Sequence, residues 1–221
     1  MGKTALVIGA TGLTGTALVK LLIADTDFES VKIFGRKSTN LIHPKITEYI
    51  VDLFNPLSFE NDFTGDVAFC CIGTTAKKTP DKDLYRQIDF GIPVTTTQLC
   101  KKNNIPQLLI ISALGANKES TVFYNRIKGK MEEAVLSQEL EKLHLLQPSL
   151  IEGNRNEFRL GEKIASIVMS IGKLFLLGSL KKYQPIQAIQ IARAMVYLSK
   201  HPFVTTRIES DEIKKLSDAY N

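Results

Sequence analysis

Short apolar runs alternate with longer segments of helical periodicity over about the first 150 residues. Strands are predicted at residues 5–8, 31–34, 107–111 and 143–147, within 47–51, and at the run 67–72, which is apolar throughout. Segments with helical spacing of apolar residues lie at 16–22, 82–103 and 122–140, with Pro93 inside the second as a kink or a first-turn proline. This alternation predicts an α/β fold with a doubly wound parallel sheet and helices on both of its faces.

The alternation weakens after Pro148. Residues 161–177 and 185–200 have helical patterns, and residues 207–209 predict a short strand followed by a final helix. We expect one domain, 1–221, in which residues 149–221 form a small, mainly helical elaboration. Open α/β sheets bind their ligands at the carboxyl ends of the strands, so this tail is expected to cap the substrate side of the pocket.

Three glycines connect the first predicted strand to the first predicted helix. Backbone N–H groups and the positive end of the helix dipole meet at such a turn, which suits a pyrophosphate. One glycine makes the turn, one lets a phosphate approach, and one lets the helix pack on the strand. The alternative is a purely structural turn, which the position between strand and helix disfavours. The predicted dinucleotide-binding residues here are Gly9, Thr11, Gly12, Leu13, Thr14 and Gly15.

Basic residues stand where an NAD site typically carries an acidic residue, at the end of the second strand. Arg36 and Lys37 occupy this position, and a guanidinium binds a 2′-phosphate that a carboxylate would repel. NADP(H) is therefore favoured over NAD(H), the alternative being a surface basic pair. Asp52 is placed either to accept from the adenine amino group or to cap a local turn, and both interpretations stay open. Further cofactor contacts are expected at Asp52, Leu53, Cys71, Ile72, Gly73 and Thr74.

A serine, a tyrosine and a lysine are placed to meet above the sheet. Ser112 ends the fifth strand, and Tyr124 and Lys128 share one face of the next helix. An ammonium near a phenol lowers the phenol's pKa from about 10, so Tyr124 would act as the general acid in carbonyl reduction. Lys128 would also hold the nicotinamide ribose, and Ser112 would bind the substrate oxygen. The alternative is an interface aromatic with a solvated lysine beside it.

Composition narrows the function classes. Hydrophobic residues make up 44% and charged residues 23%, as in soluble globular proteins, and the net charge is +5. Lysine pairs such as Lys77–Lys78 are scattered, so nucleic acid is not expected as a partner. The most hydrophobic later stretch, residues 164–180, contains Lys173 and two glycines and is shorter than the roughly 20 residues needed to span a bilayer, so no membrane partner is expected either. Cys70, Cys71 and Cys100 have no metal-ligand spacing, so no metal is expected and the thiols should be reduced. No targeting signal is visible, and a cytoplasmic location is expected.

Taken in order, the motifs resemble the atypical short-chain dehydrogenase/reductases of the Tat-interacting oxidoreductase type. They are Gly-Ala-Thr-Gly-Leu-Thr-Gly, Phe-Gly-Arg-Lys, Val-Asp-Leu, Phe-Cys-Cys-Ile-Gly-Thr-Thr, Ile-Ser-Ala-Leu-Gly-Ala and Tyr-x-x-x-Lys. The resemblance implies a Rossmann fold, NADPH binding and a Ser-Tyr-Lys site. It also implies that Pro148 and Leu150 touch the nicotinamide end and that Arg155 reaches the diphosphate. One departure is the segment 87–90, which reads Gln-Ile-Asp-Phe where many relatives carry an Asn.

The sequence alone leaves three candidate functions for this protein. The leading hypothesis is an NADPH-dependent oxidoreductase that transfers hydride to a small carbonyl substrate. The second is an NADP(H)-binding redox sensor with little or no turnover, and the third keeps the cofactor but performs epimerisation or dehydration. The scaffold is shared by proteins with many reactions and does not decide among them. The identity of the substrate and the formation of a homodimer stay open.

Overall fold

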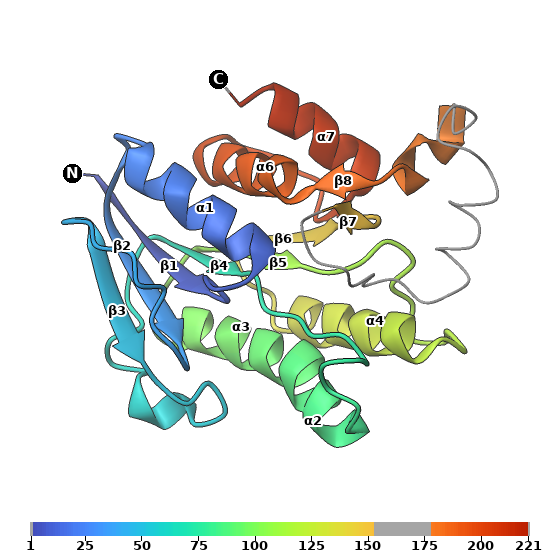
Figure 1. Ribbon diagram of the computed structural model, residues 1–221, viewed down its shortest axis with the longest axis horizontal. Coiled ribbons are helices and arrows are strands. Elements are labelled where there is room, and N and C mark those ends of the chain that lie inside the picture. Colours follow the sequence, from blue (N-terminus) through green and yellow to red (C-terminus); the bar gives the residue numbers. More distant parts are fainter. Residues whose placement is uncertain (1, 153–177, 221) are drawn as a thin grey trace.

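The computed structural model describes residues 2–152 and 178–220 (Figure 1). A parallel sheet of seven strands lies at its centre, in the order β3-β2-β1-β4-β5-β6-β9. The strands are β1 (Lys3–Ile8), β2 (Phe28–Gly35), β3 (Ile46–Ile50), β4 (Val67–Cys70), β5 (Gln107–Ile111), β6 (Lys142–Gln147) and β9 (Arg207–Glu209). Two short strands, β7 (Ile151–Glu152) and β8 (Ile186–Gln187), pair separately. The predicted parallel α/β fold is confirmed.

Helices cover both faces of the sheet, as Figure 1 shows. One face carries α1 (Leu13–Ala24) and α6 (Ala188–Lys200), with α7 (Ser210–Asp218) packed on α6. The other face carries α2 (Lys82–Arg86), a π-helix (Gln87–Gly91), α3 (Ile92–Lys102) and α4 (Phe123–Leu136). Short 3-10 turns occur at Pro56–Ser58 and Gly178–Tyr183. The sheet is therefore the middle layer of three.

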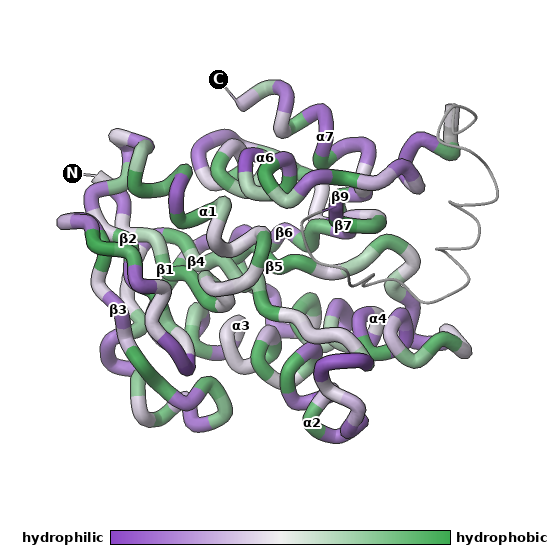
Figure 2. Tube along the Cα trace, in the orientation of Figure 1, coloured by the Kyte–Doolittle hydropathy of each residue, from purple (hydrophilic) through white to green (hydrophobic). Residues whose placement is uncertain are grey.

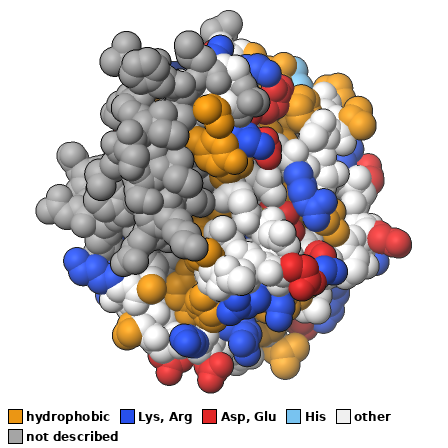
Figure 3. Space-filling view, turned by 90° about the vertical axis from the view of Figure 1, so that its right-hand side faces the viewer, with side chains coloured by type: hydrophobic (Ala, Val, Ile, Leu, Met, Phe, Trp, Pro, Cys, Tyr) orange, Lys and Arg blue, Asp and Glu red, His pale blue; other side chains and the backbone are white. Residues whose placement is uncertain are grey.

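Each face of the sheet has its own hydrophobic core. Successive side chains of a strand point to opposite faces, so the continuous apolar runs supply both cores at once. Cys71 belongs to the core beneath α1 and α6, whereas Cys70 belongs to the core beneath α3 and α4. Figure 2 shows the hydrophobic strands enclosed by more polar helix surfaces and loops. On the face seen in Figure 3, Lys and Arg lie among acidic, polar and hydrophobic side chains.

Most strand boundaries differ from the sequence prediction by one or more residues, and β2 and β4 show why. β2 begins at Phe28, ahead of the apolar run, because Phe28 and Ser30 pair with β1 although Glu29 and Ser30 interrupt the hydrophobic pattern. β4 ends at Cys70, although the backbone N–H of Cys71 still donates to the carbonyl of Ile8. Boundaries of this kind depend on pairing with neighbouring strands, which hydrophobicity alone does not encode.

The segment predicted as one long helix is three consecutive helical pieces. Pro93 lies in the first turn of α3, directly after the wide π turn. Proline has no N–H with which to continue the α-helical ladder, and the N–H of Ile92 instead donates to the carbonyl of Gln87 in the wider turn. This irregularity places Asp89 inside the π turn, facing α4.

The described part of the tail completes the sheet and one helical layer. The predicted strand at 207–209 is confirmed as β9, which extends the sheet beside β6. Residues 186–187 form β8 before α6 begins, so the predicted helix at 185–200 starts at Ala188. α6 packs against α1 over a face of the sheet. The helix predicted at 161–177 lies outside the described residues.

Candidate functional site: a groove along the carboxyl edge of the sheet

The three glycines of the first turn have different surroundings. Gly9 has φ +87°, a conformation that favours glycine, and a Cβ there would lie 2.7 Å from the carbonyl carbon of Cys71. A Cβ on Gly15 would lie 2.1 Å from the carbonyl oxygen of Gly9, so α1 can approach the turn only without a side chain there. The nearest atom to a Cβ on Gly12 is the Gly9 oxygen, at 3.2 Å. Turn geometry and close packing thus account for Gly9 and Gly15.

The amino-terminal end of α1 is suited to an anion. Gly12 is the N-cap, no side chain caps the helix, and the first turn holds no acidic residue. The hydroxyl of Thr16 donates to the carbonyl of Ala10 at 2.9 Å and fixes the turn. Thr14 is buried, and its hydroxyl has no hydrogen-bond partner among the described residues. Unpaired backbone N–H groups at a helix start bind phosphates, so these residues fit the diphosphate of a dinucleotide.

A first pocket lies beside the glycine turn, between the ends of β1 and β2. The glycine turn, the carboxyl end of β2 and the loops after β3 and β4 all contribute residues to it. Arg36 and Lys37 are exposed at its rim. Its lining residues are Gly9, Ala10, Thr11, Ile33, Phe34, Gly35, Arg36, Lys37, Leu53 and Ile72.

Asp52 does not line this pocket. One of its carboxylate oxygens accepts from the backbone N–H of Phe54 at 3.0 Å, and its carbonyl accepts from Asn55. This geometry is the turn cap, one of the two interpretations left open by the sequence. Leu53, the next residue, is buried and faces the pocket.

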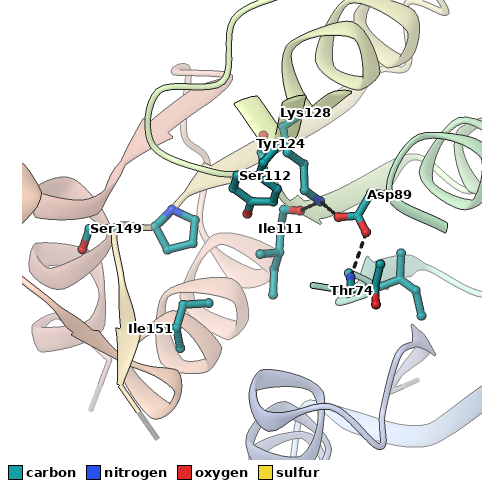
Figure 4. A pocket seen from close by; sticks show the side chains of 11 residues that line it. Thr74, Asp89, Ile111, Ser112, Tyr124, Lys128, Ser149 and Ile151 are labelled. Atoms are coloured by element: carbon teal, nitrogen blue, oxygen red, sulfur yellow. Dashed lines mark hydrogen bonds and ion pairs between the residues drawn. The ribbon is translucent and has the colours of Figure 1, made fainter. Parts of the chain in front are cut away.

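A second pocket lies above β4, β5 and β6 (Figure 4) and shares Ile72 with the first. The two pockets therefore follow one another along the carboxyl edge of the sheet, across the point where the strand order reverses between β1 and β4. The lining of the second pocket comprises Ile72, Gly73, Thr74, Asp89, Ile111, Ser112, Tyr124, Lys128, Pro148, Ser149 and Ile151. The predicted Ser-Tyr-Lys set thus meets in one place.

Some predicted cofactor residues line neither of these two pockets. Gly12 and Leu13 line a neighbouring groove next to the start of α6. The sulfur of Cys71 lies 4.0 Å from the sulfur of Met195 in the core, which leaves its backbone beside the glycine turn. The carbonyl of Leu150 accepts from Ile186. Arg155 lies outside the described residues.

Lys128 makes a buried ion pair that the sequence analysis did not predict. Its ammonium nitrogen lies 3.0 Å from a carboxylate oxygen of Asp89, and both side chains are at most 3% exposed. The same nitrogen donates to the carbonyl of Ile111 at 3.3 Å, while Asp89 accepts from the N–H of Thr74 at 2.8 Å (Figure 4). Burial opposes the charge of Lys128, but Asp89, Tyr124 and Cys70 together favour it and raise the pKa of Lys128.

Ser112 is held by a second buried carboxylate. Its hydroxyl donates to Glu132 on α4, which also accepts from Gln147 and Arg207, each at 2.8 Å. Glu132 is 2% exposed, so its charge is compensated inside the protein. Neither carboxylate was predicted from the sequence as part of the site. The spacing of Glu132, one helical turn after Lys128, would have indicated a pair with Lys128, whereas its partners in the structure lie directly after β5, in β6 and in β9.

The strand order, the glycine turn at the order reversal and the groove define an NAD(P)-binding protein of the Rossmann type. The family model described as NAD(P)H-binding matches residues 9–152, and the chain belongs to this family. Protein FMP52, mitochondrial, from Candida glabrata is 30% identical over 200 residues, covering 88% of this chain and 84% of that protein. Protein HTATIP2 from Rattus norvegicus is 28% identical over 167 residues, covering 74% of this chain and 69% of that protein. The resemblance to the Tat-interacting, atypical short-chain dehydrogenase/reductase type is confirmed.

Solved structures share the fold at low sequence identity. A short-chain dehydrogenase/reductase from Veillonella parvula in complex with NADP has a TM-score of 0.62 at 14% identity, covering 90% of this chain and 87% of that one. The Bordetella bronchiseptica enzyme WbmH in complex with NAD+ has a TM-score of 0.68 at 16% identity, covering 98% of this chain and 79% of that one. These similarities establish the fold and leave the choice between NAD and NADP open.

The expected cytoplasmic location is wrong. Relatives from Debaryomyces hansenii, Candida albicans and Candida glabrata are all named mitochondrial FMP52 proteins. The expectation relied on reading the start of the chain, which does not determine where such a protein is found. Within residues 2–152 and 178–220, no helix is both long and apolar enough to span a membrane.

Proposed function

We propose that this protein is an NADP(H)-dependent oxidoreductase that transfers hydride to a small carbonyl substrate. The observation that carries the proposal is the position of Tyr124 and Lys128, which lie on one face of α4 and line a pocket continuous with the dinucleotide groove. Ser149 and Ile151 line the same pocket, which supports a single domain whose tail supplies part of the substrate wall.

The reaction needs a proton as well as a hydride. The nicotinamide, when bound, supplies the hydride. Tyr124 donates the proton to the carbonyl oxygen, and the ammonium of Lys128 stabilises the phenolate that remains. Two donors of Lys128 face Asp89 and Ile111, and the third is assigned to a hydroxyl of the nicotinamide ribose.

The preference for NADP(H) is supported by the rim of the first pocket. Arg36 and Lys37 both line it, beside Gly35 and the glycine turn. A 2′-phosphate placed there would meet two cations, and a guanidinium can bind it through two parallel hydrogen bonds. NAD(H) has a neutral 2′-hydroxyl in place of this phosphate.

Ser112 favours a second candidate function, an NADP(H)-binding redox sensor with little turnover. Because its hydroxyl donates to Glu132, it must rotate before it can bind a substrate oxygen. In the oxidoreductase, substrate binding drives that rotation. In the sensor, Ser112 stays bound to Glu132 and serves only the packing of α4 on β5.

A substrate screen separates the two functions. The purified protein is incubated with NADPH and a panel of small aldehydes and ketones, and loss of NADPH absorbance is followed for the wild type and for Ser112→Ala. The oxidoreductase consumes NADPH with at least one compound, and Ser112→Ala slows this by at least about tenfold. Tight NADPH binding without consumption across the panel supports the sensor and contradicts the oxidoreductase.

A further inference from the structure

Asp89 is a buried acidic residue that pairs with Lys128 inside the second pocket. It lies in the π turn between α2 and α3, is 1% exposed and lines the pocket with Lys128. One carboxylate oxygen faces the Lys128 ammonium, and the other accepts from the backbone of Thr74 on the loop that follows β4. The carboxylate therefore links α4 to a loop that lines the pocket.

Lys128 has few other groups that could support its charge. Tyr124 faces it from α4, Cys70 from β4, and the carbonyl of Ile111 from β5. Burial raises the pKa of the Cys70 thiol to about 11, so Cys70 is neutral at physiological pH. Glu132, one turn further along α4, accepts from Ser112, Gln147 and Arg207. Among the residues that the structure describes, the carboxylate paired with Lys128 is that of Asp89.

We propose that Asp89 is a positioning residue, which keeps Lys128 in its ammonium form inside the pocket and fixes that ammonium against the loop after β4 through Thr74. The role in turnover rests on the proposed function, because the ammonium acts there on the Tyr124 phenolate. The ion pair between Asp89 and Lys128 itself requires neither cofactor nor substrate.

Removal of the carboxylate has a definite consequence for Tyr124. A buried lysine without a counter-ion loses its proton readily, because burial penalises the charged form. A neutral Lys128 no longer stabilises the phenolate, so Tyr124 would ionise at higher pH. If Lys128 instead kept its charge without Asp89, its ammonium would act on Tyr124 uncompensated, and Tyr124 would ionise at lower pH. The two cases therefore shift the pH at which Tyr124 ionises in opposite directions.

The test is a pH titration of tyrosinate absorbance in the ultraviolet, which is not obscured by tryptophan because the chain has none. Subtracting the titration of Tyr124→Phe from that of the wild type isolates Tyr124 from the other five tyrosines of the six. The same subtraction is made in each variant background. Asp89→Asn is expected to raise the titration midpoint of Tyr124 by about one pH unit or more, as Lys128→Met does. An unchanged or lowered midpoint contradicts the proposal.

Matched variants show whether the effect passes through Lys128. Asp89→Glu keeps the carboxylate and is expected to keep the wild-type midpoint. Glu132→Gln removes a buried carboxylate that is not paired with Lys128 and is expected to leave the midpoint unchanged. In a Lys128→Arg background the cation cannot lose its proton, so Asp89→Asn there is expected to lower the midpoint. A rise in that background contradicts the proposal.

Folding and turnover are assessed separately. If Asp89→Asn does not fold, Asp89→Asn/Lys128→Met decides: recovered folding supports the dependence of the buried ammonium on Asp89, and no recovery contradicts it. The titration needs neither cofactor nor substrate, so its result stands even if no carbonyl compound is reduced. If NADPH is consumed, the pH profile of turnover in Asp89→Asn is expected to lose activity at a lower pH than in the wild type, as Lys128 becomes neutral.

Discussion

The hydroxyl of Ser112 donates a hydrogen bond to Glu132, a carboxylate buried between α4 and the sheet. Gln147 at the end of β6 and Arg207 in β9 donate to the same carboxylate, so it connects three strand ends and a helix. The residue predicted to bind the substrate oxygen is therefore also part of the framework of the pocket.

The first prediction concerns the stability that Glu132 contributes. Glu132→Ala leaves the donors of Ser112, Gln147 and Arg207 without their shared acceptor and should lower the free energy of unfolding by about 3 kcal/mol, measured in denaturant. Glu133→Ala is the matched control, because Glu133 is half-exposed and pairs with Lys118 at the surface. Its expected cost is below about 1 kcal/mol. Equal losses of unfolding free energy in both variants would show that the buried carboxylate stabilises the fold no more than a surface carboxylate does.

The second prediction concerns the glycine turn. Gly15→Ala places a Cβ only 2.1 Å from the carbonyl oxygen of Gly9, which is too close for two unbonded atoms. The substitution should therefore move α1 away from the turn. Calorimetry is expected to show at least a tenfold loss of NADPH affinity. Gly35→Ala is the control from the same pocket, because its Cβ would meet its nearest atom at 3.8 Å. Retained affinity in Gly15→Ala would contradict the packing argument.

The third prediction concerns discrimination between the two dinucleotides. Arg36→Asp should weaken NADPH binding by at least tenfold, about 1.4 kcal/mol, because a carboxylate repels the 2′-phosphate. NADH affinity should change by less than about threefold. Calorimetry with both nucleotides measures this, and Lys32→Asp, on β2 and away from the lining of the pocket, controls for the change in net charge. Equal losses for NADPH and NADH would remove the argument for NADP(H).

The fourth prediction concerns thiol reactivity. The thiolate is the reactive form, and burial raises the pKa of Cys70 to about 11. Burial also raises the pKa of Cys100 strongly, with Cys70 adding to the effect. Both should resist alkylation in the native protein at pH 8 and react at once in denaturant, as mass spectrometry of digested samples would show. Rapid native labelling at Cys70 would contradict its burial.

The parts of the fold that depend on local pattern could be predicted from the sequence. The buried strand at 107–111 is apolar at every position after Gln107, and residues 207–209 were found in spite of their short length. The wide turn before Pro93 and the early start of β2 at Phe28 could not be predicted, because both follow from hydrogen bonding to other segments.

Residue type and spacing led to several of the candidate site residues. The structure places Gly9 of the glycine turn, Arg36 and the Tyr124–Lys128 pair along the two adjoining pockets, and their roles in binding and catalysis stay predictions. Asp89 could not be assigned, because its partner Lys128 lies 39 positions away and meets it only through the packing of the π turn on α4. The orientation of Ser112 likewise depends on Glu132, which spacing alone does not connect to it.

The most direct test of the account compares Tyr124→Phe with the wild type in two measurements on the same preparations, NADPH affinity by calorimetry and NADPH consumption with an active carbonyl compound. We expect an affinity within about threefold of the wild type together with a rate at least a hundredfold lower, since the phenol donates the proton and is not required for binding the cofactor. Retained consumption would contradict it, because another residue would then move the proton.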